Sequence, residues 1–140
     1  MFALPLQPID QYRHVGTATS VSQADPHQLV MLLFDGAIAA VLQARHALAC
    51  GDVTTRGQTI SRGMRIIDEG LKASLESRGD PALEENLRSL YEHMVHRLFV
   101  ANVQGSDEPL AEVARLLGEL RSAWAAIAPV PGRAPADLRA

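Results

Sequence analysis

Apolar residues recur at intervals of three and four along four stretches of this 140-residue chain, and this spacing is typical of one face of an α-helix. Runs of alternating apolar and polar residues, which would indicate strands, are missing from the sequence. Aromatic residues make up only 4% of the chain. The pattern predicts an all-α protein with a core of Leu, Ile, Val and Ala. Its four helices are expected to run from Ala24 to about Cys50, from Asp52, Thr54 or Thr55 to about Arg78, from Asp80 to about Gln104, and from Ser106 or Asp107 to about Ile127.

The predicted helices begin and end at recognisable residues. Asp25–Pro26 and Asp80–Pro81 each combine an N-cap carboxylate with a proline suited to the first helical position. Gly51, Gly79 and Gly105 follow the ends of the first three helices, where a left-handed residue commonly stops a helix. Turns this short place consecutive helices side by side, so we expect an antiparallel up-down-up-down four-helix bundle.

The segments outside the bundle differ from it in composition. Residues 1–23 contain two prolines and a polar connector, and we interpret them as an N-terminal arm or cap without the features of a secretory signal. Residues 24–128 form the predicted bundle, and the proline-rich residues 129–140 are interpreted as a disordered tail. The apolar segment 29–49 is nearly long enough to cross a bilayer. Its charged residues, among them Asp35 and Arg45, favour a buried helix without membrane insertion.

The first and third helices carry more apolar surface than one core face requires. On the first helix, Met31, Ile38 and Leu42 lie on a second stripe beside the core positions. On the third helix, we assign the core positions to Leu83, Leu87, Leu90, Met94, Leu98 and Ala101. A second stripe with a spacing of four runs beside them and consists of Tyr91, Val95 and Phe99.

The second helix has a clean predicted core stripe, which begins at Val53, and an unusual flank of small residues beside it. This flank contains Gly63, Ile66 and Gly70. A glycine inside a helix costs about 1 kcal/mol relative to alanine, so two at heptad spacing suggest close approach of another backbone. That backbone is either another helix of the bundle or a bound ligand.

Few residues indicate catalytic or metal chemistry. A net charge of −3 gives no reason to expect nucleic acid as a partner. Cys50, the single cysteine, lies at a helix end and is interpreted as a small apolar residue. His93 and His96 next to Glu92 suit a surface metal site, but two solvated histidines are the favoured interpretation because no second ligand pair occurs. We therefore expect no enzyme activity, no catalytic residues, no cofactor and no metal.

Surplus apolar surface of this kind usually marks a partner site. Grooves between helices commonly accept an amphipathic helix, which favours a helix-binding module. A homodimeric helical adaptor that uses the same surface is the alternative.

Several segments of the chain resemble the flagellin-specific export chaperone family, FliS. They begin with Tyr12, Val15-Gly16 and Val21, and continue through ADPHQLVMLLFDGAIAAVLQAR and SRGMRIIDEGLKASL to NLRSLYEHMVHRLFVAN and LLGELRSAW. The segment MLLFDGA and the pattern Leu-Tyr-x-x-Met-x-x-Arg-Leu at residues 90–98 are specific to the family. The resemblance covers all four predicted helices and the arm.

The resemblance implies a cytoplasmic chaperone that binds the C-terminal region of flagellin, prevents its premature polymerisation and assists delivery to the flagellar type III export gate. It also implies that an N-terminal arm with a tyrosine, matched here by Tyr12, covers apolar surface until flagellin displaces it. From the arm and the surplus surface together, the expected flagellin-binding or arm-docking residues are Tyr12, Val15, Met31, Ile38, Leu42, Ile66, Gly70, Tyr91, Val95 and Phe99.

Overall fold

The computed structural model describes residues 25–75 and 80–127, and residues 30–127 form one compact unit. The predicted arm, the predicted tail and the turn residues Arg78 and Gly79 lie outside the described residues. The helices of the described part are α2 (Pro26–Cys50), α3 (Val53–Arg65) with its π-helical continuation η3 (Ile66–Lys72), α4 (Pro81–Gln104) and α5 (Asp107–Ala126).

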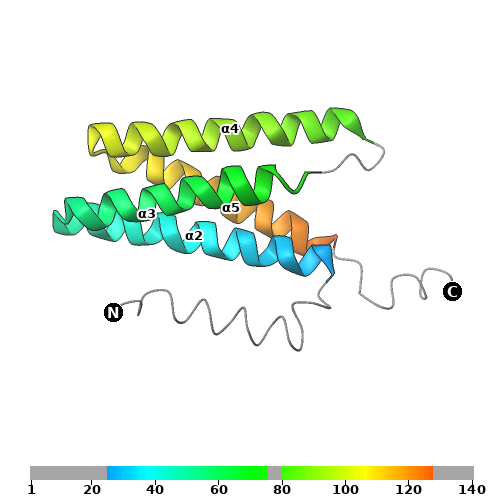
Figure 1. The fold of residues 1–140 in the computed structure, drawn as a ribbon, viewed down its shortest axis with the longest axis horizontal. Coiled ribbons are helices and arrows are strands. Elements are labelled where there is room, and N and C mark those ends of the chain that lie inside the picture. Colours follow the sequence, from blue (N-terminus) through cyan, green and yellow to red (C-terminus); the bar gives the residue numbers. More distant parts are fainter. Residues whose placement is uncertain (1–24, 76–79, 128–140) are drawn as a thin grey trace, which may run out of the picture. The chain divides into compact units, whose positions relative to one another are not determined.

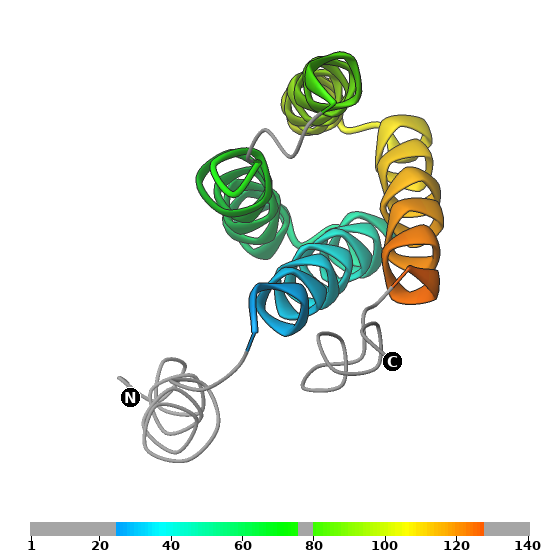
Figure 2. The same ribbon diagram turned by 90° about the vertical axis from the view of Figure 1, so that its right-hand side faces the viewer.

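Successive helices run in opposite directions, and the end-on view shows them in the order α2, α3, α4, α5 around a shared interior (Figures 1 and 2). The described residues contain helices and no strand. The predicted all-α four-helix bundle is therefore confirmed.

Short polar and glycine-containing signals set most of the helix boundaries as predicted, but the second helix ends at Lys72, earlier than expected. Gly51 and Gly105 adopt the left-handed conformation, with φ of 74° and 61°, which a residue without a Cβ adopts at little cost. Three helices begin at an Asp side chain that accepts a hydrogen bond from a backbone N–H three residues later. These bonds join Asp25 to Gln28 (2.8 Å), Asp52 to Thr55 (3.0 Å) and Asp80 to Leu83 (3.1 Å).

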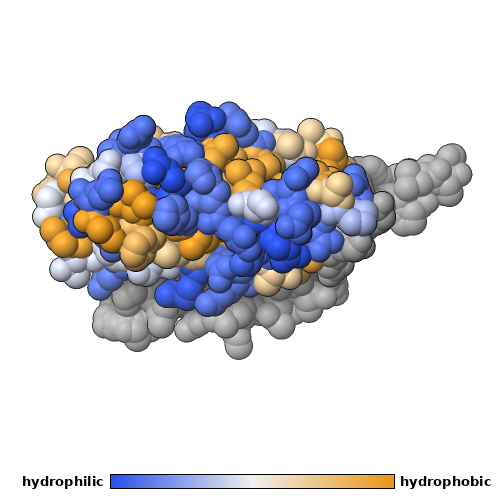
Figure 3. Space-filling view, turned by 90° about the horizontal axis from the view of Figure 1, so that it is seen from above, coloured by the Kyte–Doolittle hydropathy of each residue, from blue (hydrophilic) through white to orange (hydrophobic). Residues whose placement is uncertain are grey.

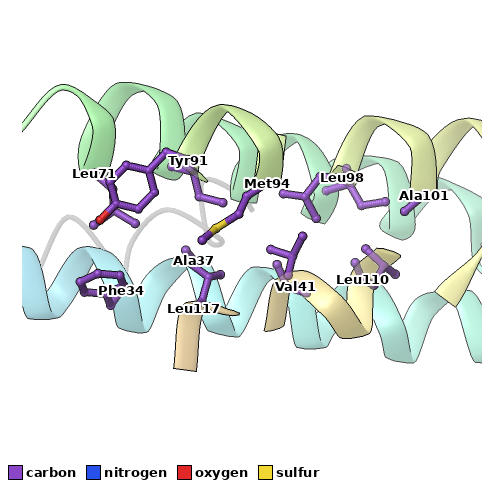
Figure 4. Close-up of a cluster of buried hydrophobic side chains, with 14 residues drawn as sticks. Phe34, Ala37, Val41, Leu71, Tyr91, Met94, Leu98, Ala101, Leu110 and Leu117 are labelled. Atoms are coloured by element: carbon purple, nitrogen blue, oxygen red, sulfur yellow. The ribbon is translucent and has the colours of Figure 1, made fainter. Parts of the chain in front are cut away.

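The core is a row of aliphatic side chains and small residues between the four helices. Alanine is frequent on the buried face of α2, which lets neighbouring helices approach that face closely. Figure 4 shows the middle of this core, where side chains from α2, the α3–η3 segment, α4 and α5 converge. The buried cluster contains Phe34, Ala37, Val41, Ala44, Ile60, Ile67, Leu71, Tyr91, Met94, Leu98, Ala101, Leu110, Val113 and Leu117.

Helix α2 is long and apolar enough to cross a membrane by length and composition. Its apolar face, however, is packed in the bundle core, where Phe34, Ala37 and Val41 are buried. A core helix of a bundle passes the same test of length and composition, so the length and composition of α2 are weak evidence for a membrane span.

The glycine flank of the second helix faces α2, which decides between the two alternatives left open by the sequence. A Cβ at Gly63 would lie 3.6 Å from the Ala40 Cβ and 3.6 Å from the Leu98 Cδ1. A Cβ at Gly70 would lie 2.9 Å from the Leu33 Cδ2, closer than real Cβ atoms come. The glycines therefore allow close approach within the bundle.

The second helix is not a continuous α-helix, which corrects the sequence expectation. It changes after Arg65 to a π-helix that ends at Lys72. Ile67, Leu71 and Leu75 are spaced four apart, and in an α-helix each such step turns a side chain about 40° away from the core. The wider i→i+5 turn offsets this drift, and Ile67 and Leu71 are both buried.

We predict that Gly63→Leu destabilises the bundle, whereas Gly57→Leu does not. The Gly63 site is closed by side chains of α2 and α4, while a Cβ at Gly57 on the same helix has nothing within 4 Å. Overpacking at Gly63 is expected to lower the free energy of unfolding by about 1–3 kcal/mol, as measured by urea unfolding. Equal stability of the two variants would contradict the described α2–α3 packing.

Candidate partner-binding surface

The apolar stripe of α4 turns from the core to the surface along the helix. Its residues are spaced four apart, and every four-residue step in an α-helix advances the stripe by about 40°. Tyr91 is only 4% exposed and Val95 is half-buried, whereas Phe99 is 55% exposed and Val103 is 67% exposed. Figure 3 looks down on the side of the bundle that carries α4, where apolar surface lies in patches between polar side chains.

The same drift occurs on α2. Phe34 is buried, Ile38 is half-buried against the core, and Leu42 is 48% exposed. Met31, the third residue of the predicted second stripe, is half-buried. The exposed end of this stripe therefore lies in the second half of α2.

Polar contacts show which neighbouring helix the α2 stripe borders. Arg45 donates two hydrogen bonds to the Asp107 carboxylate, both 2.8 Å long, and Arg121 forms an ion pair with Asp35. Both pairs join α2 to α5. The paired guanidinium holds the pKa of the Asp107 carboxyl below its usual value, mainly through its hydrogen bonds.

Ile38 and Leu42 lie between these two ion pairs. Along α2, the sequence positions Asp35, Ile38, Leu42 and Arg45 are separated by three, four and three residues, so they share one side of the helix. Because the first and last of them contact α5, the two apolar residues between them border α5. We call Ile38 and Leu42 the α2–α5 strip.

An equivalent arrangement occurs on α4. Glu92 accepts a hydrogen bond from Lys72 at 3.4 Å, so it joins α4 to the end of η3. Ten residues further on, the Asn102 side chain and carbonyl accept bonds of 3.3 and 3.2 Å from Arg56 of α3. Both contacts join one side of α4 to the α3–η3 segment.

Val95 and Phe99 lie between those two contacts, again at spacings of three, four and three along the helix. We call this pair the α3–α4 strip. In the end-on view, the side of the bundle between α3 and α4 is opposite the side between α2 and α5 (Figure 2). The two strips therefore lie on opposite sides of the bundle.

Three of the expected partner-binding residues are packed inside the bundle. Tyr91 belongs to the core, which corrects its assignment to the surplus stripe, and its burial raises the pKa of the phenol to about 12. Ile66 packs against α2, where a Cβ at Gly36 would be 3.4 Å from its Cδ1. Gly70 is covered by Leu33. Tyr12 and Val15 lie outside the described residues.

Val53 and Leu83, which the sequence pattern assigns to the core, are instead on the surface. Val53 is 62% exposed and Leu83 is 52% exposed. Both occupy the first turn of a helix, at an end of the bundle where fewer neighbouring residues are available to cover them. Val103, which the sequence interpretation missed, is found by extending the stripe one step beyond Phe99.

The polar surface shows charge pairing between α4 and α5. Glu112 of α5 accepts hydrogen bonds from His93 (2.9 Å) and Arg97 (2.6 Å) of α4, and these two bonds lower the pKa of its carboxyl. His93 and His96 are both exposed, as expected for two solvated histidines, and His93 also contacts Glu112. Within residues 25–75 and 80–127, no group of three or more His, Cys, Asp or Glu side chains is placed to hold a metal ion.

Comparisons with known proteins agree with one another. The sequence profile of the family described as "Flagellar protein FliS" matches residues 8–131. The flagellar secretion chaperone FliS of Salmonella typhimurium is 40% identical over 121 residues, which cover 86% of this chain and 90% of that protein. The flagellar secretion chaperone FliSB of Pseudomonas aeruginosa is 36% identical over 85% of this chain and 94% of its own length. The Escherichia coli FliS is 33% identical over 81% of this chain and 83% of its own.

We predict that Asp107→Asn reduces the loss of stability in acid. The folded-state pKa of Asp107 is depressed, so its contribution is present above the unfolded-state pKa and is lost as pH falls through the folded value. The effect is expected to be below about 1 kcal/mol because the pair is solvent-screened. Urea unfolding at pH 7 and pH 3 measures it. Glu85→Gln, at an exposed position of α4, is the control and should keep the wild-type pH dependence.

We predict that Tyr91→Phe protects the bundle at high pH. Because the folded-state pKa of Tyr91 is raised to about 12, its phenol stays protonated in the folded state while the unfolded chain ionises near pH 10. The contribution of the buried Tyr91 phenol to stability is therefore fully present below pH 10. The free energy of unfolding falls by about 2–3 kcal/mol as pH rises through 12. Unfolding curves at pH 9 and pH 11.5 measure the loss, and an equal loss in Tyr91→Phe would contradict the buried position.

Proposed function

The chain belongs to the FliS family, and from this premise we propose that it is a flagellar export chaperone that binds the C-terminal region of flagellin. Chaperone function requires no reacting group, which agrees with a surface whose surplus is apolar. The named role of the curated relatives, flagellar secretion chaperone, supports the proposal.

The observation that carries the proposal is the position of the two apolar strips on opposite sides of the bundle. The α2–α5 strip includes Leu42, and the α3–α4 strip includes Phe99, both about half exposed. A rigid partner with one flat face reaches only one of them. A chain that is disordered before binding can follow the surface of the bundle and cover both.

The cost of ordering a disordered partner also favours wrapping around both strips. Ordering a disordered segment opposes binding, so a large apolar area has to be covered before association becomes favourable. One strip offers two apolar side chains, whereas the two strips together with the neighbouring exposed Val103 offer a longer contact path. Binding should therefore depend on apolar area more than on charge.

The remaining parts of the proposal concern the cellular role. We propose that the bound chaperone acts in the cytoplasm, keeps flagellin from polymerising early and assists its delivery to the export gate. We also propose that the arm, residues 1–23, competes with flagellin through Tyr12 and Val15 when the chaperone is empty.

We predict that a C-terminal flagellin fragment co-elutes with the full chain in size-exclusion chromatography with light scattering, and that the complex has the mass of both chains. Apolar burial makes the complex tolerant of salt, so co-elution should persist in 0.5 M NaCl. Failure of the fragment to co-elute, with the protein running as a dimer, would instead support the homodimeric adaptor.

Two surface variants test wrapping on the same complex. Leu42→Asp and Phe99→Asp should each weaken fragment binding by roughly tenfold or more, and their effects should add because the sites are distant. Ser89→Asp, which places the same charge at an exposed polar position of α4, is the matched control. Loss of binding from only one of the two variants would show that the partner occupies one side and does not wrap.

A further inference from the structure

The two sides of the bundle that carry the apolar strips differ in charge. Beside the α2–α5 strip, Arg45 and Arg121 are each paired with a carboxylate. Beside the α3–α4 strip, Arg56 donates its hydrogen bonds to the side chain and the carbonyl of Asn102, which are neutral acceptors. These bonds hold the Arg56 guanidinium in place, and its positive charge is not neutralised.

Helix α3 carries this excess of positive charge. Residues Val53–Arg65 contain three arginines and no Asp or Glu, although the net charge of the chain is −3. Among residues 25–75 and 80–127, neither Arg56 nor Arg65 forms an ion pair with a carboxylate. Glu69, four residues after Arg65, lies in the π-helical segment. The surface of α3 is therefore a positive patch on a protein of negative net charge.

A concavity along α3 reaches α4, and it contains both of these arginines. Its lining includes Arg56, Gly57, Gln58, Ser61, Arg65 and Asn102. A Cβ at Gly57 would have nothing within 4 Å. A glycine inside a helix costs about 1 kcal/mol relative to alanine, and packing against α2 accounts for that cost at Gly63 and Gly70. No packing within the described part of the bundle accounts for Gly57, and the open space above it admits the backbone of a partner.

The concavity adjoins the α3–α4 strip. Phe99 is three residues before Asn102 and four before Val103, so the three side chains are neighbours on α4. A segment in this place meets arginines along α3 and exposed apolar side chains along α4, which suits an amphipathic helix with carboxylates along one edge. Arg56 and Arg65 are about 14 Å apart along the helix axis, which favours a partner with several carboxylates over a single small anion.

We propose that the α3–α4 side binds an acidic amphipathic helix of the bound flagellin region. Its carboxylates face Arg56 and Arg65, and its apolar residues face Phe99 and Val103. This inference rests on the proposed function, because it specifies which part of the cargo lies on this side. The α2–α5 side, whose arginines are already neutralised, takes an apolar segment. The difference in charge thus sets which cargo segment lies on which side of the bundle.

Salt dependence of fragment binding tests the charge contribution. A fluorescently labelled C-terminal flagellin fragment is titrated with the full chain at 50 and 500 mM NaCl, and anisotropy gives the dissociation constant. For the wild type we expect it to rise by roughly fivefold between the two salt concentrations, with the apolar contacts keeping the complex measurable. Arg65→Gln should raise it by roughly threefold or more at 50 mM and reduce its dependence on salt. Arg115→Gln, the same change at an exposed position of α5, is the matched control and should behave as wild type.

Gly57→Leu tests the open space in the same titration. It should raise the dissociation constant by roughly tenfold or more, while urea unfolding shows an undiminished free energy of unfolding. An unchanged dissociation constant in either Gly57→Leu or Arg65→Gln, with binding still weakened by Leu42→Asp, would overturn this inference and leave the proposed function standing. If the wild type does not bind the fragment at either salt concentration, both are overturned.

Discussion

The close approach of α2 to the α3–η3 segment is the constraint that decides which side chains can lie along that side of α2. It is possible because small residues face one another or face a larger side chain: Gly63 lies against Ala40, and Gly70 lies against Leu33. Where the two helices approach this closely, a large side chain fits opposite a glycine, as Leu33 does at Gly70 and Ile66 at Gly36. The apolar residues Ile38 and Leu42 lie on the other side of α2, toward α5.

Helical geometry explains why the surplus residues are exposed at one end of a stripe and buried at the other. The steps of four from Phe34 to Leu42, and from Tyr91 to Phe99, each rotate the stripe away from the core. The spacing of apolar residues predicts both stripes, but it does not show where along each stripe the exposed part begins. The pattern therefore assigns Tyr91 to the surface stripe and does not include the exposed Val103.

Much of the fold followed from local chemistry that a sequence displays directly. The Asp caps and the left-handed Gly51 and Gly105 depend only on neighbours within a few residues, which the sequence displays. Their predicted roles are confirmed. The change to a π-helix at Ile66 and the exposure of Val53 depend on contacts between helices and on the length of the bundle. These features become visible only when the helices are placed together.

Charged and polar residues lie at both ends of each apolar strip. The Arg45–Asp107 and Asp35–Arg121 pairs bracket one strip, and Glu92 and Asn102, which contact the α3–η3 segment, bracket the other. For a partner bound at both strips, each half of the contact holds the other half at a high effective concentration. Such a partner is retained while either half stays bound, yet it can leave in two successive steps, each smaller than release of the whole chain. If the proposed cargo binds both strips, their placement on opposite sides of the bundle would combine its secure retention with its removal from one end.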